Sequence, residues 1–103
     1  MKKYETLLLF SPDLSTEERK QIVDKLSNVI QENSGEITAV DEWGMKELAY
    51  PVKKFTRGYY LRLEYGSPGT TVHELERVIR ISEGILKFMS VKVEETFESV
   101  KEA

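Results

Sequence analysis

The chain has 103 residues, 40 % of them apolar, which is enough for one domain with a two-layer core and excludes a separate catalytic domain. It contains no cysteine, which excludes disulfides and thiolate metal sites and is compatible with a reducing compartment such as the cytoplasm. Its net charge of −3 does not indicate nucleic-acid binding by the whole molecule, and its apolar run Leu7–Phe10 is too short for a signal peptide or a membrane span.

The first half of the chain predicts a strand, a helix and a second strand. Lys2–Phe10 ends in a run that is apolar on both faces, which favours a central strand. Ser15–Glu18 is a capping box, and an apolar stripe at helical spacing predicts a helix from there to about Asn33. Glu36–Ala49 alternates weakly and is interrupted at Trp43–Gly44, which indicates an edge strand with a bulge.

The second half predicts a strand, a helix and a last strand. Lys53–Arg57 predicts a turn, and Gly58–Tyr65 alternates between apolar and polar residues, as expected of a half-buried strand. Thr71–Glu74 has the pattern of a second capping box and predicts a helix that ends near Ser82. Ile85–Val93 is again apolar on both faces and predicts the fourth strand.

The predicted order is βαββαβ, which defines the fold class. It predicts an α+β, ferredoxin-like fold with a four-stranded antiparallel sheet and both helices on one face. We expect one domain over residues 1–95 and an acidic, flexible tail over residues 96–103. Two helices cannot cover both faces of the sheet. Apolar residues of the first and fourth strands are therefore expected to be exposed unless a partner covers them.

Catalysis has little support in the sequence. His73 is the only histidine, and no phosphate-binding loop, dinucleotide-binding or zinc-protease motif occurs, so no cofactor and no metal are expected. An acylphosphatase-like hydrolase of the same topology is one alternative, although Ser11–Leu14 lacks the arginine that such an enzyme needs. A regulatory module that dimerises through its sheet and binds a small ligand is the other alternative.

Charge is distributed unevenly along the chain. Trp43–Arg62 holds five cations and one anion, whereas residues 94–103 hold four anions and one cation. Tyrosine and tryptophan residues lie near these lysines, and this mixture is typical of RNA-binding surfaces. Alternatively, the lysines only protect a sheet edge against aggregation.

Short motifs distributed over most of the chain carry a resemblance to a known family. They are Tyr4-Glu5, Pro12, Gly35, Trp43-Gly44-Met45-Lys46, Leu48-Ala49-Tyr50-Pro51-Val52, Lys54, Gly58-Tyr59, Ile85-Leu86-Lys87 and Val91-Lys92. With these motifs, the sequence resembles the bacterial ribosomal small-subunit protein six family over about residues 3–92. The most specific element is Trp-Gly followed by Leu-Ala-Tyr-Pro at this spacing.

The resemblance implies a structural protein of the cytoplasmic ribosome, without enzymatic activity or membrane association. It implies binding to the central domain of small-subunit ribosomal RNA during assembly, as a heterodimer with small-subunit protein eighteen, and a monomer when isolated. Its net charge of −3 makes the chain a poor RNA binder alone, so we expect a basic partner to supply positive charge. By similarity, the partner interface comprises Asp41, Trp43, Lys46, Glu47, Leu48 and Tyr50. By similarity, the residues toward RNA are Lys2, Lys3, Tyr4, Lys54, Lys87 and Lys92.

Overall fold

A computed structural model describes residues 1–94 and contains four strands and two helices in these residues. The elements are β1 (Lys2–Phe10), α1 (Thr16–Glu32), β2 (Glu36–Val52), β3 (Phe55–Ser67), α2 (Gly69–Arg80) and β4 (Ile85–Glu94). This order confirms the predicted βαββαβ sequence of elements. The predicted acidic tail over residues 96–103 lies outside the described residues.

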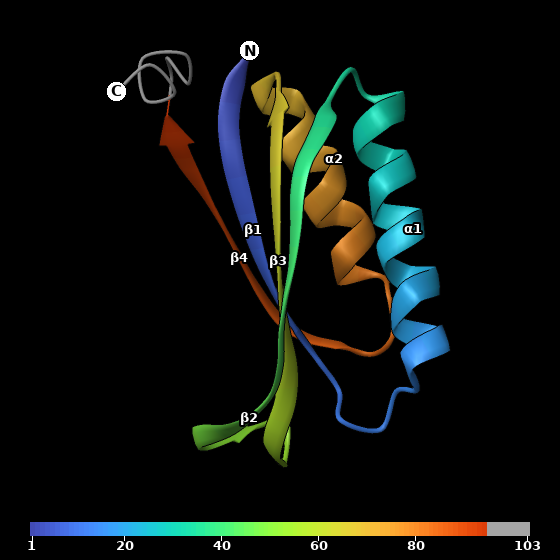
Figure 1. The fold of residues 1–103 in the computed structure, drawn as a ribbon, viewed down its shortest axis with the longest axis vertical. Helices are drawn as coiled ribbons and strands as arrows, with labels where there is room; N and C mark the ends of the chain where they lie inside the picture. The colour runs from blue at the N-terminus through green and yellow to red at the C-terminus, as the bar shows by residue number, and fades with distance from the viewer. Residues whose placement is uncertain (95–103) are drawn as a thin grey trace.

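The strands form one antiparallel sheet in the order β2-β3-β1-β4. Both helices pack on the same face, and the other face, here called the open face, carries no helix (Figure 1). The α+β, ferredoxin-like fold is therefore confirmed. The hairpin of β2 and β3 extends beyond the helices at the lower end of the view. No helix in the described part of the chain is long and apolar enough to cross a membrane.

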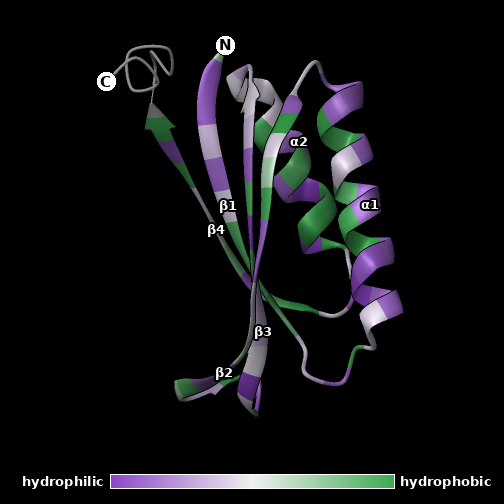
Figure 2. Cartoon of the chain, in the orientation of Figure 1, coloured by the Kyte–Doolittle hydropathy of each residue, from purple (hydrophilic) through white to green (hydrophobic). Residues whose placement is uncertain are grey.

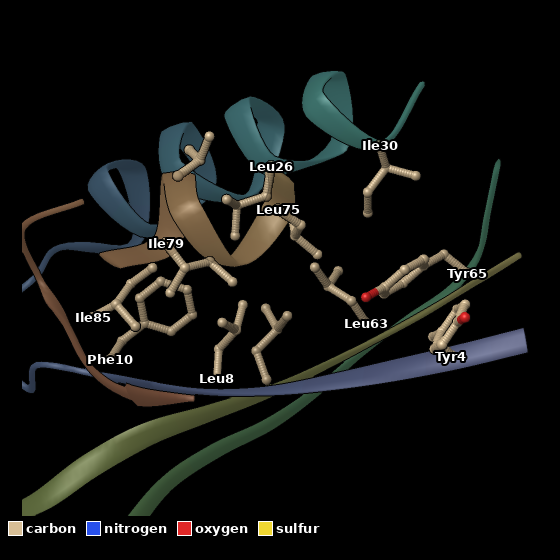
Figure 3. Packing of buried hydrophobic residues seen from close by; sticks show 12 residues of the cluster. Tyr4, Leu8, Phe10, Leu26, Ile30, Leu63, Tyr65, Leu75, Ile79 and Ile85 are labelled. Atoms are coloured by element: carbon tan, nitrogen blue, oxygen red, sulfur yellow. The ribbon is translucent and has the colours of Figure 1, made fainter. Parts of the chain in front are cut away.

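The core lies between the sheet and the two helices. On β1, every second residue from Tyr4 to Phe10 is buried toward the helices, as the period of a strand requires. Leu26 of α1 and Leu75 of α2 are fully buried against this row (Figure 3). The ring of Tyr4 stacks on the ring of Tyr65 with a centroid distance of 6.0 Å. Both tyrosines are thus part of the core.

Three hydroxyl groups form a chain across β3, β1 and the edge strand β4. The Oγ1 atom of Thr6 lies 2.8 Å from the hydroxyl of Tyr65 and 2.8 Å from the Oγ atom of Ser90. Each contact is a hydrogen bond, so a polar group buried in the core has its partner. Burial nevertheless raises the pKa of Tyr65, because the core disfavours the phenolate.

The two helices begin differently from each other. The predicted capping box of α1 is confirmed, because the amide of Ser15 donates to the Glu18 carboxylate and the amide of Glu18 donates to the Ser15 hydroxyl. The predicted capping box of α2 is wrong. This helix starts at Gly69, and Thr71 is buried inside it with its hydroxyl donating to the Asn33 carbonyl, 2.5 Å away. Thr71 thus caps the end of α1 instead of the start of α2.

The turn of the β2–β3 hairpin is shorter than predicted. Val52 pairs with Phe55, which leaves only Lys53 and Lys54 in the turn, with φ angles of +49° and +75°. Two central residues with positive φ are the pattern of a type I′ turn, which usually carries Asn-Gly because other residues are strained there. The pairing of β2 with β3 has a register shift between Glu47 and Val52, so Leu48–Pro51 has no regular pairing partner on β3.

Gly58 of β3 leaves room for the side chain of Leu9 on the neighbouring strand β1. A Cβ atom at this position would overlap the Cδ1 atom of Leu9 and lie 3.1 Å from the Phe10 carbonyl oxygen. Leu9 is only 2 % exposed and so has little room to move. At Gly66 of the same strand, an added Cβ atom would meet nothing closer than 3.7 Å.

We therefore expect Gly58→Ala to lower the free energy of unfolding by about 1 to 3 kcal/mol through overpacking. Gly66→Ala is the matched control and should change stability by no more than about 1 kcal/mol. Urea denaturation of both variants measures the difference. Equal stability of the two variants would contradict the packing role of Gly58.

Candidate nucleic-acid and partner interface

The open face of the sheet has a charged end and an apolar end. The residues of β1 that alternate with the core point to this face, and they change from Lys3 and Glu5 to Leu7 and Leu9 along the strand. Figure 2 shows the hydrophilic bands at the start of β1. One face thus combines two surfaces of different chemistry.

The charged end is organised by Arg62 of β3. Its guanidinium donates to Glu5, Asp41 and Glu64, with each closest N–O distance 2.6 Å. Lys3 forms an ion pair with Glu64 at 2.8 Å. These five residues, here called the Arg62 network, join β1, β2 and β3. They contain two cations and three anions, so the network has a net charge of −1 and does not attract phosphate.

The ion pairs of the network shift the pKa values of its members. Hydrogen bonding to Glu64, and then to Glu5 and Asp41, raises the pKa of Arg62 against the opposing effect of burial. Lys3 has the largest effect on Glu64 and, together with Arg62 and Thr38, lowers the pKa of Glu64 to about 2 despite partial burial. Both directions favour the charged forms, which shows that pairing outweighs desolvation here.

The apolar end lies toward the hairpin and is exposed. Met89 of β4 is 58 % exposed, Trp43 of β2 is 48 % exposed and Tyr50 is 67 % exposed. The ring of Trp43 lies 6.4 Å from that of Tyr60, centroid to centroid. A hollow of about 230 Å³ opens beside these rings and is lined by Leu7, Leu9, Tyr60, Lys87, Phe88 and Met89. We call the exposed Trp43, Tyr50 and Met89, together with the half-buried Leu7 and Tyr60 beside them, the apolar patch. The predicted exposure of apolar residues on the uncovered face is confirmed on β4 for Met89 and for Val91, which is 42 % exposed. On β1 it is wrong for Leu9, which neighbouring side chains bury.

The residues predicted to meet a protein partner all lie on β2, an edge strand. Trp43, Lys46, Glu47 and Tyr50 are exposed, and Leu48 is half-buried in a second hollow that Tyr50 also lines. Asp41, in contrast, is already paired with Arg62, although its side chain is 49 % exposed. These residues therefore follow one another along β2, but they differ in how far their side chains are available for binding.

The residues predicted to face RNA do not form one cluster. Lys2 and Lys92 lie near the start of β1, because β4 ends beside it, and both are exposed. Lys87 is opposite Leu9, toward the other end of β1, and Lys54 is in the hairpin turn.

The remaining two members of this set are less accessible. Lys3 is held by Glu64 in the Arg62 network. Tyr4 is 9 % exposed and stacked in the core, so its ring is not available to a nucleobase. Tyr4 lies between the polar residues Lys3 and Glu5 on a strand, where neighbouring side chains point to opposite faces. This pattern indicates that Tyr4 faces the helices.

A further hollow of about 220 Å³ lies between α1 and β2. The guanidinium of Arg19 lies 3.7 Å from the ring centroid of Tyr59, whose hydroxyl donates to Glu42 at 2.6 Å. This hydrogen bond raises the pKa of Tyr59. Two polar residues that line the hollow, Arg19 and Glu42, thus both contact Tyr59. His73 is exposed on α2, and within residues 1–94 no group of three or more histidine or carboxylate side chains could hold a metal ion.

Comparisons with known proteins agree over most of the chain. The family model of ribosomal protein S6 matches residues 3–92. The small ribosomal subunit protein bS6 of Nitratidesulfovibrio vulgaris (strain DP4) is 53 % identical over 97 % of this chain and 99 % of its own length. The bS6 protein of Caldanaerobacter subterraneus subsp. tengcongensis is 43 % identical over 92 % of this chain and 100 % of its own length.

A solved structure gives the same result for the fold. The crystal structure of 30S ribosomal protein S6 from Thermotoga maritima matches with a TM-score of 0.86 and 28 % identity, covering 98 % of this chain and 92 % of that one. A βαββαβ domain with these relatives is a structural protein of the small ribosomal subunit. The chain belongs to the ribosomal protein S6 family.

The pKa of Glu64 predicts how stability changes in acid. The folded-state pKa of about 2 lies below the ordinary value of 4.5, so the ionised carboxylate stabilises the fold above about pH 4.5. That stabilisation, on the order of 1 to 3 kcal/mol, is lost as the pH falls from about 4.5 toward 2. Glu64→Gln should therefore lose less stability than the wild type over this pH window, measured by urea denaturation at each pH.

The control for this experiment is Glu83→Gln. Glu83 is exposed and forms no ion pair with any residue of the described part of the chain. The control should follow the wild type across the whole pH range. If Glu64→Gln also followed the wild type, the Arg62 network would not contribute to stability through Glu64.

Proposed function

We propose that this chain, as part of the small ribosomal subunit, binds the central domain of small-subunit ribosomal RNA during assembly as a heterodimer with small-subunit protein eighteen. The observation that carries the proposal is the exposed apolar patch on the open face of a chain with a net charge of −3. An exposed apolar surface of this kind marks a protein interface. A net negative charge makes RNA binding by the chain alone weak.

In this proposal the partner binds along β2 and the apolar end of the open face. Trp43 and Tyr50 supply the apolar contacts, because both rings are about half exposed or more. Glu47 adds an exposed carboxylate that suits a basic partner, whereas Asp41 contributes less because it is paired with Arg62. Lys46 and Leu48 lie between these groups on the same strand. The isolated chain is a monomer in this proposal, and its site of action is the ribosome in the cytoplasm.

The RNA contacts in this proposal come from exposed lysines around the sheet. Lys2 and Lys92 serve one end of the sheet, and Lys54 and Lys87 serve the end near the hairpin turn. Lys3 contributes less, since Glu64 neutralises it. Tyr4 is excluded from this set because its ring lies in the core. A basic partner seated between the two ends would complete a continuous positive surface.

The first prediction from this proposal concerns affinity for RNA. We expect the chain alone to bind a central-domain RNA fragment at least tenfold more weakly than the heterodimer, a difference of about 1.4 kcal/mol. The physical reason is the net charge of −3, which the partner offsets. Filter binding at one salt concentration, with and without the partner, measures it. Superimposable curves would contradict a shared RNA-binding surface.

The second prediction concerns the partner interface. Tyr50→Asp should weaken association with the partner by about 1 to 3 kcal/mol, because it places a carboxylate in an apolar contact. The free energy of unfolding should change by only about 0.5 kcal/mol, since Tyr50 is 67 % exposed. Isothermal titration calorimetry and thermal denaturation measure the two effects.

The matched control is Ile81→Asp, which introduces the same carboxylate at a residue that is 65 % exposed at the end of α2. This variant should bind the partner as the wild type does. Equal losses of partner affinity in the two variants would mean that the added charge, rather than the position on β2, weakens association. A large fall in melting temperature for Tyr50→Asp alone would instead place Tyr50 in the core.

A further inference from the structure

A basic hollow lies where the hairpin turn, the end of α2 and the start of β4 meet. Its volume is about 270 Å³, several times the roughly 30 Å³ that a water molecule occupies. Its lining consists of three cations and four apolar residues, namely Lys53, Arg80, Lys87, Ile79, Ile85, Leu86 and Phe88. No carboxylate is among them. We call this hollow the Lys53–Arg80–Lys87 cleft.

The three cations are exposed and largely unneutralised. Within residues 1–94, neither Lys53 nor Lys87 forms an ion pair. Arg80 has a single long contact with Glu76, 3.8 Å between nitrogen and oxygen, and its guanidinium lies 5.4 Å from the ring centroid of Phe88. Three like charges around one hollow repel one another, and an anion in the hollow would relieve that repulsion.

The backbone of the turn is a second, independent indication that the cations have a role. Lys53 and Lys54 both have positive φ, in a turn type that Asn-Gly forms with less strain. Strained conformations of this kind cluster at functional sites. Lys53 of this turn lines the same hollow as Arg80 and Lys87, which come from two other elements.

We propose that the Lys53–Arg80–Lys87 cleft binds one phosphate of an RNA backbone. This inference rests on the proposed function and extends it to a site that includes Lys53 and Arg80, two residues outside the set expected to face RNA. Arg80 offers the planar guanidinium fork that matches phosphate geometry, and the two lysines add point charges. No lining side chain is a carboxylate that would compete with phosphate.

The position of the cleft favours RNA over a free phosphate ion. All three cations are exposed, so a single small anion would remain largely solvated and weakly held. A polyanion instead gains affinity by releasing the counterions of its backbone. Lys87 also lines both hollows of the apolar patch, so the cleft borders the surface proposed for the partner. RNA could therefore contact the cleft and the partner together.

The test measures how RNA affinity of the heterodimer depends on salt. Replacing Lys53 and Lys87 together by glutamine should flatten the slope of log affinity against log salt by about 0.7 to 0.9, the loss of one phosphate contact. Because both lysines are assigned to the same phosphate, Lys53→Gln and Lys87→Gln should not be additive. A loss twice as large in the double variant would place the lysines on separate phosphates and overturn the shared site.

The matched control is Lys20→Gln with Lys25→Gln, which removes two exposed lysines from α1. This variant should retain the wild-type slope. Lys53→Arg with Lys87→Arg should also retain it, and circular dichroism should show all variants folded. If the cleft variant and the α1 variant flattened the slope equally, the effect would be one of net charge and the cleft would be rejected.

Inorganic phosphate titrated into the protein distinguishes the source of the anion. We expect the NMR shift changes of the protein's backbone amides near residues 53, 80 and 87 not to reach saturation at millimolar phosphate. Tight saturation together with an unchanged RNA slope in the cleft variant would mean that the site takes a free anion, which overturns the RNA assignment. Wild-type slopes in the cleft variant, with normal RNA binding, would remove the cleft and leave the proposed function intact. No RNA binding by the wild-type heterodimer would overturn the proposed function and the cleft together.

Discussion

Two helices can cover only one face of a four-stranded sheet, and the rest of this structure follows from that constraint. Every second residue of β1 is buried against α1 and α2, while the residues between them must find another environment. At one end of the open face, Arg62 forms ion pairs with three carboxylates, so the charged side chains there are paired with one another. At the other end, Tyr50 and Met89 remain exposed, and only another molecule could cover them.

The residues that stabilise the sheet and the residues available for binding therefore lie at different ends of one face. The Arg62 network joins three strands through side chains that are partly shielded from solvent, so its ion pairs are worth more than those of a fully exposed pair. In the described part of the chain, exposed lysines outside the network lie instead at the ends of strands and in the hairpin turn. A chain with an overall charge of −3 can thus still present local positive surfaces.

The fold was predictable from the sequence because its signals are local. Periodicity identified the strands and helices, and the Ser15 capping box identified the start of α1. The start of α2 was wrong because Thr71 forms a tertiary hydrogen bond with Asn33, which no local pattern contains. The candidate site was less predictable for the same reason. Arg62 binds residues of two other strands, and Lys53 meets Arg80 only through the folded hairpin.

The hydroxyl chain of Thr6, Tyr65 and Ser90 has a consequence for how the strands find their alignment. A register shift of one residue would turn the apolar side chains to the other face of the sheet, so hydrophobic alternation is enough to disfavour it. A shift of two residues keeps them on the same face, so alternation alone does not disfavour it. If β4 moved by two residues, Phe88 or Lys92 would take the place of Ser90 beside Thr6. If β3 moved likewise, Tyr65 would carry its hydroxyl away from Thr6 and leave it in the core without a partner. The three hydroxyls therefore penalise misaligned sheets that the apolar residues alone would tolerate.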